Sequence, residues 1–358
     1  MEVIAFELTD RALRLEYDEL FAECPHAFIQ QSTHWAEVIQ ELGPDQPIFL
    51  LCRDAGWAIA GLPLYLFEHQ LGNLLTSVPQ AGPLGGVFVR PGLSPDLQRN
   101  AYRQLIETAT ALAEANHCLA LTILSNPFWP DDEFYKLFLD PTLVFENFTQ
   151  YVPLNELVRR SGGQKNNLAR AKQAGFEIKF CQSSTDLQQW YQLHCRRQAE
   201  IGAVPLSFTL LENIFRILAP LDQAAFILAT LNQEIVAGCC YVYHQSVIDV
   251  FAISMDSAHA AKAPNALLAD FSMSWARSKG RLIYNWQSSP SRTSGVYNHK
   301  RQWGSIESPY FFLTKLFCEV QRVEEIGPTL IKSEYPGHYM VPFVAFEQGF
   351  HHRYFKKP

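Results

Sequence analysis

The feature that most constrains the fold is an order of predicted elements that occurs twice along the chain. In each half, amphipathic helices come first, a set of apolar strands follows, and a further helix and a buried strand close the series. The 358 residues also exceed the size at which a single hydrophobic core usually stops growing. The repeated order therefore predicts two related domains, over residues 1–150 and 151–358.

In the first half, helix signals alternate with apolar runs. The runs PIFLLCRD and WAIAGLPLYLFEH meet at Asp54-Ala55-Gly56, a sequence typical of a β-hairpin turn. A loop rich in Gly and Pro, QAGPLGGVFVRPG, separates this hairpin from the next helix. The predicted helices cover residues 11–22, 33–42 and 95–116, and CLALTILSN is predicted to be a buried strand.

The second half shows the same order more clearly. Helices are predicted over residues 155–174, 185–201 and 208–219, and the runs AAFILATL, EIVAGCCYVYH and VIDVFAISM form an antiparallel meander. The next helix begins at Pro264, with Asn265 as its N-cap, and ends at Gly280. The buried strand LIYNWQ, a short helix over 297–303 and the strand PYFFLTKL follow. Because the halves share almost no sequence identity, the duplication is inferred from element order alone.

Composition excludes several classes of protein. A net charge of −7 argues against a general nucleic-acid binder and against DNA as a partner. The eight cysteines are scattered and form no CxxC motif, which argues against a disulfide framework or a zinc knuckle. There is no HExxH motif and no signal peptide, and no apolar run is long enough to span a membrane. We expect a cytoplasmic protein without a catalytic metal.

The segment GGQKNNLARAKQAGFEIKF is locally basic within this acidic chain. Six basic residues lie between Arg159 and Lys179, against the single acidic residue Glu177. On a helix, Asn166, Arg170 and either Lys165 or Asn167 share a face through three- and four-residue spacing. Such a face can form charge-assisted hydrogen bonds with phosphates. A solvated basic helix is the alternative.

The segment GVYNHKRQWG follows the predicted strand LIYNWQ and the loop SSPSRTS. Lys300 therefore comes after the carboxyl end of a buried strand, where open α/β sheets usually bind their ligands. A cation there can bind a phosphate or stabilise a developing oxyanion. The alternative is a surface helix with Lys300 and Arg301 in water and Trp303 packed inward.

These segments, together with APNALL between them, resemble the FemAB family of peptidoglycan bridge-forming aminoacyltransferases. KNNLARAKQAG is similar to the basic segment of the family, and HKRQWG is similar to its F-K-x-x-[FW]-G signature. The resemblance covers residues 151–316 well, and it covers the first half through element order and the segments QSTHW and GPLGG. It implies an α/β (α+β) fold of two tandem GNAT-like domains, each with a mixed, mainly antiparallel central sheet flanked by helices.

The resemblance also implies roles for individual residues. Lys300 matches the family lysine near the reacting carbonyl and is the candidate catalytic residue. Lys165 and Arg170 fall in the segment associated with a phosphate-bearing substrate. Asn265 opens the helix whose backbone amides point at the donor in GNAT folds. The candidate substrate-binding residues are Lys165, Asn166, Arg170, Asn265, Gln287, Arg292 and Tyr297.

Two departures from the family pattern bear on the chemistry. His299 stands beside the lysine where the family has Phe, so packing there is expected to differ. The glycine-containing pyrophosphate loop of CoA-dependent GNAT enzymes is not visible in HAAKAPNALL, which favours an aminoacyl-tRNA over acyl-CoA as the co-substrate. No tightly bound cofactor is expected.

We therefore expect transfer of an aminoacyl or other acyl group to a primary amine of a cell-wall or related precursor. The acceptor is expected to be a phosphate-bearing small molecule, and tRNA is a candidate donor. Two alternatives stay open: an acyl-CoA-dependent N-acyltransferase acting on a small amine or lipid precursor, and a non-catalytic binding protein of the same fold. The sequence leaves the general base, the acceptor and the oligomeric state open. The enzymatic reading requires that the two basic segments meet at one cleft.

Overall fold

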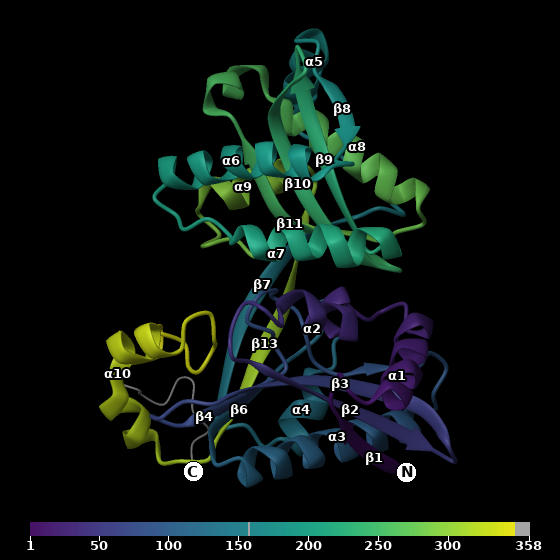
Figure 1. Ribbon diagram of the computed structural model, residues 1–358, viewed down its shortest axis with the longest axis vertical. Coiled ribbons are helices and arrows are strands. Elements are labelled where there is room, and N and C mark those ends of the chain that lie inside the picture. The colour runs from purple at the N-terminus through teal and green to yellow at the C-terminus, as the bar shows by residue number, and fades with distance from the viewer. Residues whose placement is uncertain (157, 348–358) are drawn as a thin grey trace. The chain divides into compact units, whose positions relative to one another are not determined.

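The chain forms two compact units, and each contains its own set of neighbouring strands with helices packed on them (Figure 1). The computed structural model describes residues 1–156 and 158–347. Unit 1 comprises Met1–Asn147 and Pro309–Pro358, and unit 2 comprises Phe148–Ser308. Two strands, β7 (Leu143–Pro153) and β13 (Ile306–Leu316), contain the points at which the chain passes from one unit to the other.

In unit 1 the strands follow the order β1-β2-β3-β4-β6-β13. All neighbouring pairs are antiparallel except β4 and β6, which are parallel, and the short β5 pairs with β3. Besides β13, the strands are β1 (Glu2–Phe6), β2 (Gln46–Asp54), β3 (Trp57–Phe67), β4 (Asn73–Thr76), β5 (Phe88–Val89) and β6 (Cys118–Leu124).

Helices cover both faces of the unit 1 sheet, because alternate residues of a strand point to opposite sides. Leu50 of β2 belongs to one apolar core with Leu105 of α3, whereas its neighbour Phe49 contacts the ring of Tyr17 in α1. The Ser94 hydroxyl accepts the first hydrogen bond of α3 from Leu97 N. The helices are α1 (Arg11–Glu23), α2 (Thr33–Ile39), α3 (Pro95–Ala115) and α4 (Asp132–Phe138).

Unit 2 has its strands in the order β8-β9-β10-β11-β12-β7. Only β11 and β12 are parallel among its neighbouring pairs. The strands are β8 (Glu177–Phe180), β9 (Ala224–Leu231), β10 (Glu234–His244), β11 (Val247–Met255) and β12 (Ile283–Asn285). The helices are α5 (Gly162–Gln173), α6 (Ser184–Glu200), α7 (Phe208–Asn213), α8 (Pro264–Ser278) and α9 (Gly295–Gln302).

The strands of the two units have the same spatial order and the same parallel or antiparallel pairing, so the predicted fold class of two related α/β domains is confirmed. The connectivity differs in one strand, because β13 follows the other strands of unit 1 along the chain, whereas its counterpart β7 precedes those of unit 2. Even the register agrees at one informative position, because Gly61 is the fifth residue of β3 and Gly238 is the fifth residue of β10. Gly61 pairs with Leu51, and Gly238 pairs with Leu228. A Cβ at Gly61 would lie 2.7 Å from the Tyr17 ring, and one at Gly238 would lie 2.5 Å from the Trp190 ring. Glycine is needed at both positions so that an aromatic side chain can approach the sheet.

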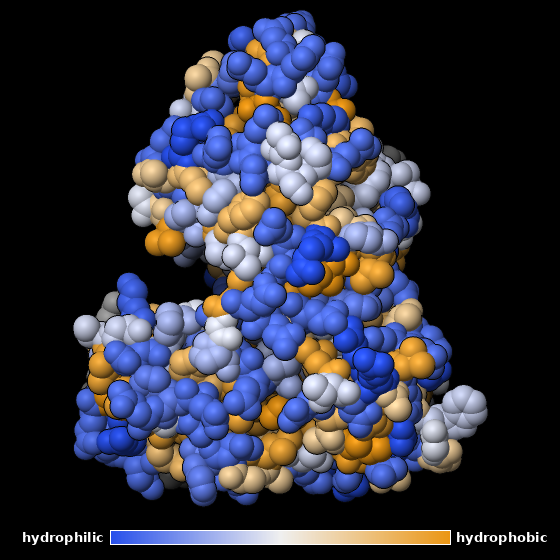
Figure 2. Space-filling model, in the orientation of Figure 1, coloured by the Kyte–Doolittle hydropathy of each residue, from blue (hydrophilic) through white to orange (hydrophobic). Residues whose placement is uncertain are grey.

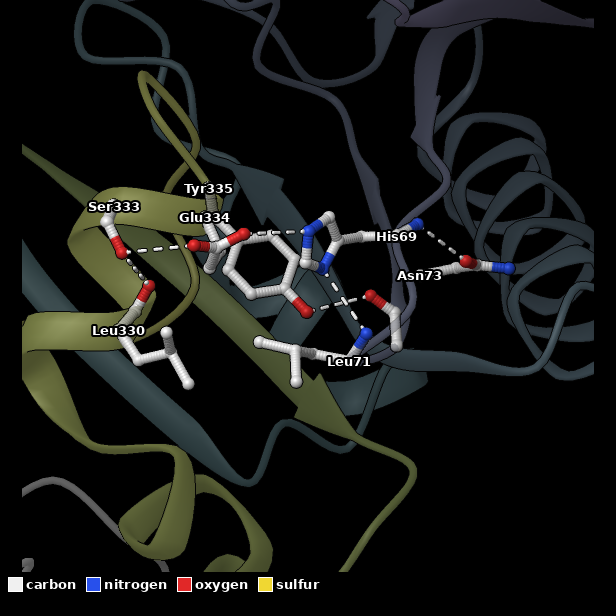
Figure 3. Close-up of polar contacts among 8 residues, drawn as sticks. His69, Leu71, Asn73, Leu330, Ser333, Glu334 and Tyr335 are labelled. Atoms are coloured by element: carbon white, nitrogen blue, oxygen red, sulfur yellow. Dashed lines mark hydrogen bonds and ion pairs between the residues drawn. The ribbon is translucent and has the colours of Figure 1, made fainter.

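The C-terminal segment packs in unit 1, and this differs from the predicted second domain over residues 151–358. Residues 312–316 of β13 pair with β6, and α10 (Val320–Glu334) contributes Val323 and Ile326 to an apolar cluster with Phe67. Figure 3 shows the polar contacts: His69 Nε2 lies 3.2 Å from Glu334 Oε2, and the Tyr335 hydroxyl donates to the Gly72 carbonyl at 2.9 Å. The last part of the predicted domain, residues 348–358, lies outside the described residues.

In unit 2 one predicted helix start is wrong by seven residues and one predicted N-cap by two. The helix predicted over 155–174 begins at Gly162, because β7 extends to Pro153 and the Ser161 hydroxyl caps the helix through Gln164 N. The N-cap of α8 is Ala263, in the left-handed region at φ 56°, so Pro264 takes the first helical position and Asn265 the second. The helix predicted over 208–219 is α7 followed by a π-helical turn, Ile214–Leu218.

Candidate active site

A pocket of about 590 Å³ opens in unit 2 where β11 stops pairing with β12. The parallel pairing covers only Val247–Asp249 with Ile283–Asn285, whereas β11 continues to Met255. Opposite β10 the register shifts, so that Phe251 is an extra residue in β11. The pocket is lined by β11 beyond this point and by residues of α5, α6, α8 and α9. All of these residues belong to unit 2.

Helix α9 places Lys300 in the wall of this pocket. The Ser294 hydroxyl caps the helix by accepting from Tyr297 N at 3.1 Å. The Lys300 side chain is 7% exposed, and its Nζ donates to the carbonyls of Gln287 at 2.9 Å and Ser288 at 2.7 Å. Burial lowers the pKa of Lys300 from 10.5 to about 8, so the group remains mainly protonated at pH 7. Two of the three ammonium N–H groups have acceptors, and the third is available to a ligand.

His299, the departure from the family pattern, lines the same pocket. Its Nδ1 lies 3.4 Å from Gln164 Nε2, and its ring contacts the edge of Trp286. The surrounding protein atoms, and then the charge of Lys300, lower the pKa of His299 below its ordinary value of 6.5. A histidine of this kind is neutral at pH 7 and can accept a proton.

Helix α5 reaches the pocket, but not through the predicted cations. Gln164 and Asn167 line it, and Gln164 also bonds to Gln302 Oε1 of α9 at 3.2 Å. Of the two residues that spacing groups with Asn166 and Arg170, Asn167 lines the pocket and Lys165 does not. Lys165, Asn166 and Arg170 are exposed and do not line the pocket.

The exposed side of α5 forms part of a mainly hydrophilic surface at the top of the view in Figure 2. Arg170 on this side donates to the carbonyl of Ala261 at 2.8 Å. Since Ala261 comes two residues before the N-cap of α8, the cationic side of α5 lies beside the start of that helix.

Asn265 lines the pocket, as expected for a residue at the start of α8. Its Oδ1 is buried and has no hydrogen-bond partner in the part of the chain that the structure describes. An unpartnered polar atom in a pocket wall indicates a position where a ligand can bind.

The other three predicted residues do not line the pocket. Gln287, at φ 61°, contributes through its carbonyl, which accepts from Lys300. Arg292 Nε donates to Glu307 Oε2 at 2.8 Å, and its guanidinium lies 4.4 Å from the ring centre of Phe148. The Tyr297 hydroxyl also donates to Glu307. Arg292 and Tyr297 therefore belong to a separate exposed cluster.

Sequence reasoning missed a buried polar pair behind the pocket wall. His194 of α6 lies 2.8 Å from Ser254 Oγ through its Nδ1, and its Nε2 accepts from Leu206 N at 3.2 Å. Ser254 and Trp286 both line the pocket. The separation of 60 positions between His194 and Ser254 leaves no local sequence signal for this contact.

None of the helices formed by the described residues combines the length and apolar character needed to cross a membrane. Among the same residues, no three His, Cys, Asp or Glu side chains gather as they would around a metal ion.

Comparison with known proteins identifies the class of the second unit. Residues 159–301 match the family model of the acetyltransferase (GNAT) domain. The fold is similar to that of FemX, with a TM-score of 0.70 and 14% identity over 91% of this chain and 100% of that chain. It is also similar to L-PGS from Bacillus licheniformis, with a TM-score of 0.58 and 13% identity over 91% of this chain and 98% of that chain.

A third solved structure is the C-terminal domain of a putative lysylphosphatidylglycerol synthetase from Agrobacterium fabrum, with a TM-score of 0.56 and 11% identity over 92% of this chain and 98% of that chain. No protein with a curated description matches the sequence. At these identities the solved structures establish the fold alone, and the family model covers residues 159–301. Residues 159–301 therefore form a GNAT acyltransferase domain, within a chain that has the FemX-like fold.

Proposed function

We propose that unit 2 transfers an acyl group to a primary amine in the pocket that contains Lys300. The observation that carries this proposal is the environment of Lys300, a buried ammonium in a pocket wall. Its Nζ is held by two backbone carbonyls, and no carboxylate forms an ion pair with it among the described residues. A cation fixed in this way is suited to stabilise negative charge that develops on a reacting carbonyl oxygen.

In the proposed reaction, the amine nitrogen attacks the acyl carbon of an activated ester or thioester. A C–N bond forms, the C–O or C–S bond to the carrier breaks, and the free N–H of Lys300 stabilises the intermediate oxyanion. His299 accepts the proton that the amine nitrogen loses. The carrier leaves as an alcohol or a thiol after taking up a proton, so no covalent intermediate with the enzyme is required.

The acceptor class is proposed from the surface next to the pocket. Lys165 and Arg170 leave the exposed side of α5 positively charged, next to the start of α8. Both features favour a phosphate-bearing substrate. The fold likeness to FemX and to lysylphosphatidylglycerol synthetases makes precursors of the cell wall or membrane lipids the first acceptors to test. Aminoacyl-tRNA and acyl-CoA are the two donors to compare.

The test uses hydroxylamine as a small surrogate amine and measures hydroxamate formation from acyl-CoA and aminoacyl-tRNA donors. Lys300→Met should lower kcat by roughly 10²- to 10³-fold, the usual effect of removing an oxyanion donor. The control is Lys136→Met in α4, the unit 1 counterpart of α9, because Lys136 is exposed and paired with Asp132.

Circular dichroism should show that both variants are folded. Full activity of folded Lys300→Met protein contradicts the assignment of Lys300. Heat stabilisation by a donor without any hydroxamate formation supports the non-catalytic binding protein instead.

A further inference from the structure

The walls of the pocket are mainly apolar. Val250, Ile253 and Met255 of β11 line one side, and Ala263 and Ala266 at the start of α8 contribute small apolar surfaces. A volume of about 590 Å³ is far more than a two-carbon acetyl group fills. Apolar walls favour a ligand that carries hydrocarbon, because its burial removes apolar surface from water.

The charges in the wall have one sign. The lining residues include the cations Lys300 and Arg197, and no aspartate or glutamate is among them. The carboxylate of Glu200, near Arg197 on α6, is held by Arg197 at 2.8 Å and by the Ser257 hydroxyl at 3.0 Å. Lys300 therefore has no anionic partner inside the pocket. A second ammonium bound next to it would be repelled strongly, since a buried site screens charges less than water does.

Two buried groups in the wall have hydrogens to donate and no acceptor. Trp286 is 6% exposed, and its indole Nε1 has no hydrogen-bond partner among the described residues. Leu206 N donates to His194 Nε2, so the ring hydrogen of His194 is on Nδ1 and points to Ser254 Oγ. Ser254 accepts this bond, and the described contacts give its own hydroxyl hydrogen no acceptor. A ligand that satisfies both groups must supply hydrogen-bond acceptors, whereas the unpartnered Asn265 Oδ1 in the same wall can accept from a donor.

We propose that the pocket selects an uncharged acyl group with an apolar chain of several carbons and discriminates against an aminoacyl group. The inference rests on the proposed function and names the class of group transferred. An aminoacyl group brings an α-ammonium, and beside Lys300 it meets a like charge that no carboxylate in the pocket wall compensates. A fatty acyl group brings only hydrocarbon and a carbonyl oxygen. The bonds made and broken are those of the proposed reaction, with hexanoyl as the simplest example of the acyl group.

The experiment compares two thioesters of N-acetylcysteamine, hexanoyl and 2-aminohexanoyl, which have the same carbon chain and neither CoA nor tRNA as the carrier. Hydroxamate formation by the full-length protein is measured at pH 7, and each rate is divided by the uncatalysed rate of the same thioester. The expected kcat/KM is at least about tenfold higher for hexanoyl. Equal values, or a higher value for 2-aminohexanoyl, would overturn this inference and leave acyl transfer itself intact. If the wild-type protein forms hydroxamate from both thioesters no faster than Lys300→Met does, the proposed function is overturned as well.

A designed carboxylate should reverse the preference. Ser254→Asp adds a negative charge to the wall, and Ser254→Asn adds a side chain of similar size without charge. The ratio of the two kcat/KM values should move roughly tenfold or more toward 2-aminohexanoyl in the Asp variant only. If Ser254→Asp does not fold, Ile201→Glu and Ile201→Gln make the same comparison at an exposed residue of the wall. An unchanged ratio in the folded acidic variants contradicts the proposed electrostatic selection.

Discussion

The two units share one fold but use one strand differently. In unit 2, β11 is continuous, and Ser254 pairs with Gly238. In unit 1 the corresponding strand is divided into β4 and β5, and Phe88 of β5 pairs with Gly61. Since Gly61 and Gly238 occupy equivalent positions, Phe88 is the counterpart of Ser254. One position of the duplicated fold is thus apolar in the first unit and polar in the second.

The segment between β4 and β5 explains the difference. After β4, Ser77 remains tied to β6, because its N–H donates to the Thr122 carbonyl and its hydroxyl accepts from Leu124 N. Gly85 then passes so close that a Cβ on it would lie 2.0 Å from the Ser77 carbonyl oxygen. The chain therefore fills part of the space that corresponds to the opening beside β11. A smaller cavity of about 300 Å³ remains there in unit 1, lined by Phe88, Asn126 and Asp131, against about 590 Å³ in unit 2.

The neighbouring side chains follow the same division. Phe88 packs against the rings of Tyr17 and Phe21, at centroid distances of 5.2 and 5.7 Å. Ser254 instead receives a hydrogen bond from His194 of α6. At this position unit 1 has a packed aromatic side chain, and unit 2 has a buried polar pair. Because Ser254 also lines the unit 2 pocket, its polarity is suited to binding a ligand there.

The largest expected effect separates these two roles. Phe88→Ala should destabilise the protein by about 3–5 kcal/mol, because it leaves a cavity in a close-packed core, and should not lower kcat/KM for acyl transfer in the folded protein. Ser254→Ala should change the unfolding free energy by only about 1 kcal/mol and lower kcat/KM. Urea denaturation and initial rates measure the two quantities. The comparison fails if Ser254→Ala is the more destabilising change.

The burial of Lys300 should appear in the pH dependence of stability. Its pKa is about 8 in the folded protein and 10.5 when exposed, so between these values the unfolded chain binds the additional proton. The contribution of Lys300 to the free energy of unfolding therefore rises with pH over this window, by roughly 3 kcal/mol in total. Buried thiols such as Cys24, whose pKa is raised by burial, contribute with the opposite sign, so the effect appears in the difference between variants. Lys300→Met should lack the Lys300 contribution, whereas Lys136→Met in unit 1 should keep it. Denaturation curves at pH 7.5, 9 and 10.5 test this, because they extend from about half a unit below the folded pKa of Lys300 to its unfolded pKa. If the free energy of unfolding changes with pH in parallel for wild type and Lys300→Met, the prediction is refuted.

The smallest expected effect tests the equivalence of the units directly. Gly61→Ala and Gly238→Ala each place a methyl group against an aromatic ring, and each should cost about 1–3 kcal/mol through overpacking. Because Trp190 also contacts His194, only Gly238→Ala should lower transfer activity as well. Thermal denaturation and initial rates provide the measurements. If the two substitutions lower the free energy of unfolding by amounts that differ by more than about 2 kcal/mol, the two glycine positions are not equivalent in packing.

Most of the helices and strands could be predicted from local sequence signals. Of the predicted site residues, Lys300 and Asn265 line the pocket. The hairpins, the meander of unit 2, α3 and α8 were all found from periodicity and capping residues. Lys300 was identified because it follows a buried strand and matches the lysine of the family signature, and it lies in the pocket wall. Asn265 was found through the helix start, although its position as the cap was wrong by two residues.

What could not be predicted depends on contacts distant in sequence. On α5, spacing alone cannot decide which face turns inward, and Gln164 is buried there through its contacts with His299 and Gln302. Glu307 holds Arg292 and Tyr297 away from the pocket in the same way. The pairing of β13 with β6 joins residues about 190 positions apart, and no local pattern indicates it.

That last pairing affects the order in which the protein can be assembled during synthesis. Unit 2 is continuous from Phe148 to Ser308, and its closing strand β7 is made before the rest of it. Unit 1 starts before unit 2 along the chain, but the strand that borders β6 is translated only after the whole of unit 2. On the ribosome, the second unit can therefore finish folding before the first, which reverses the usual N-terminal-first sequence of multidomain chains. Until β13 emerges, the β6 edge stays open, so a nascent chain stalled shortly before residue 309 should depend most on chaperones.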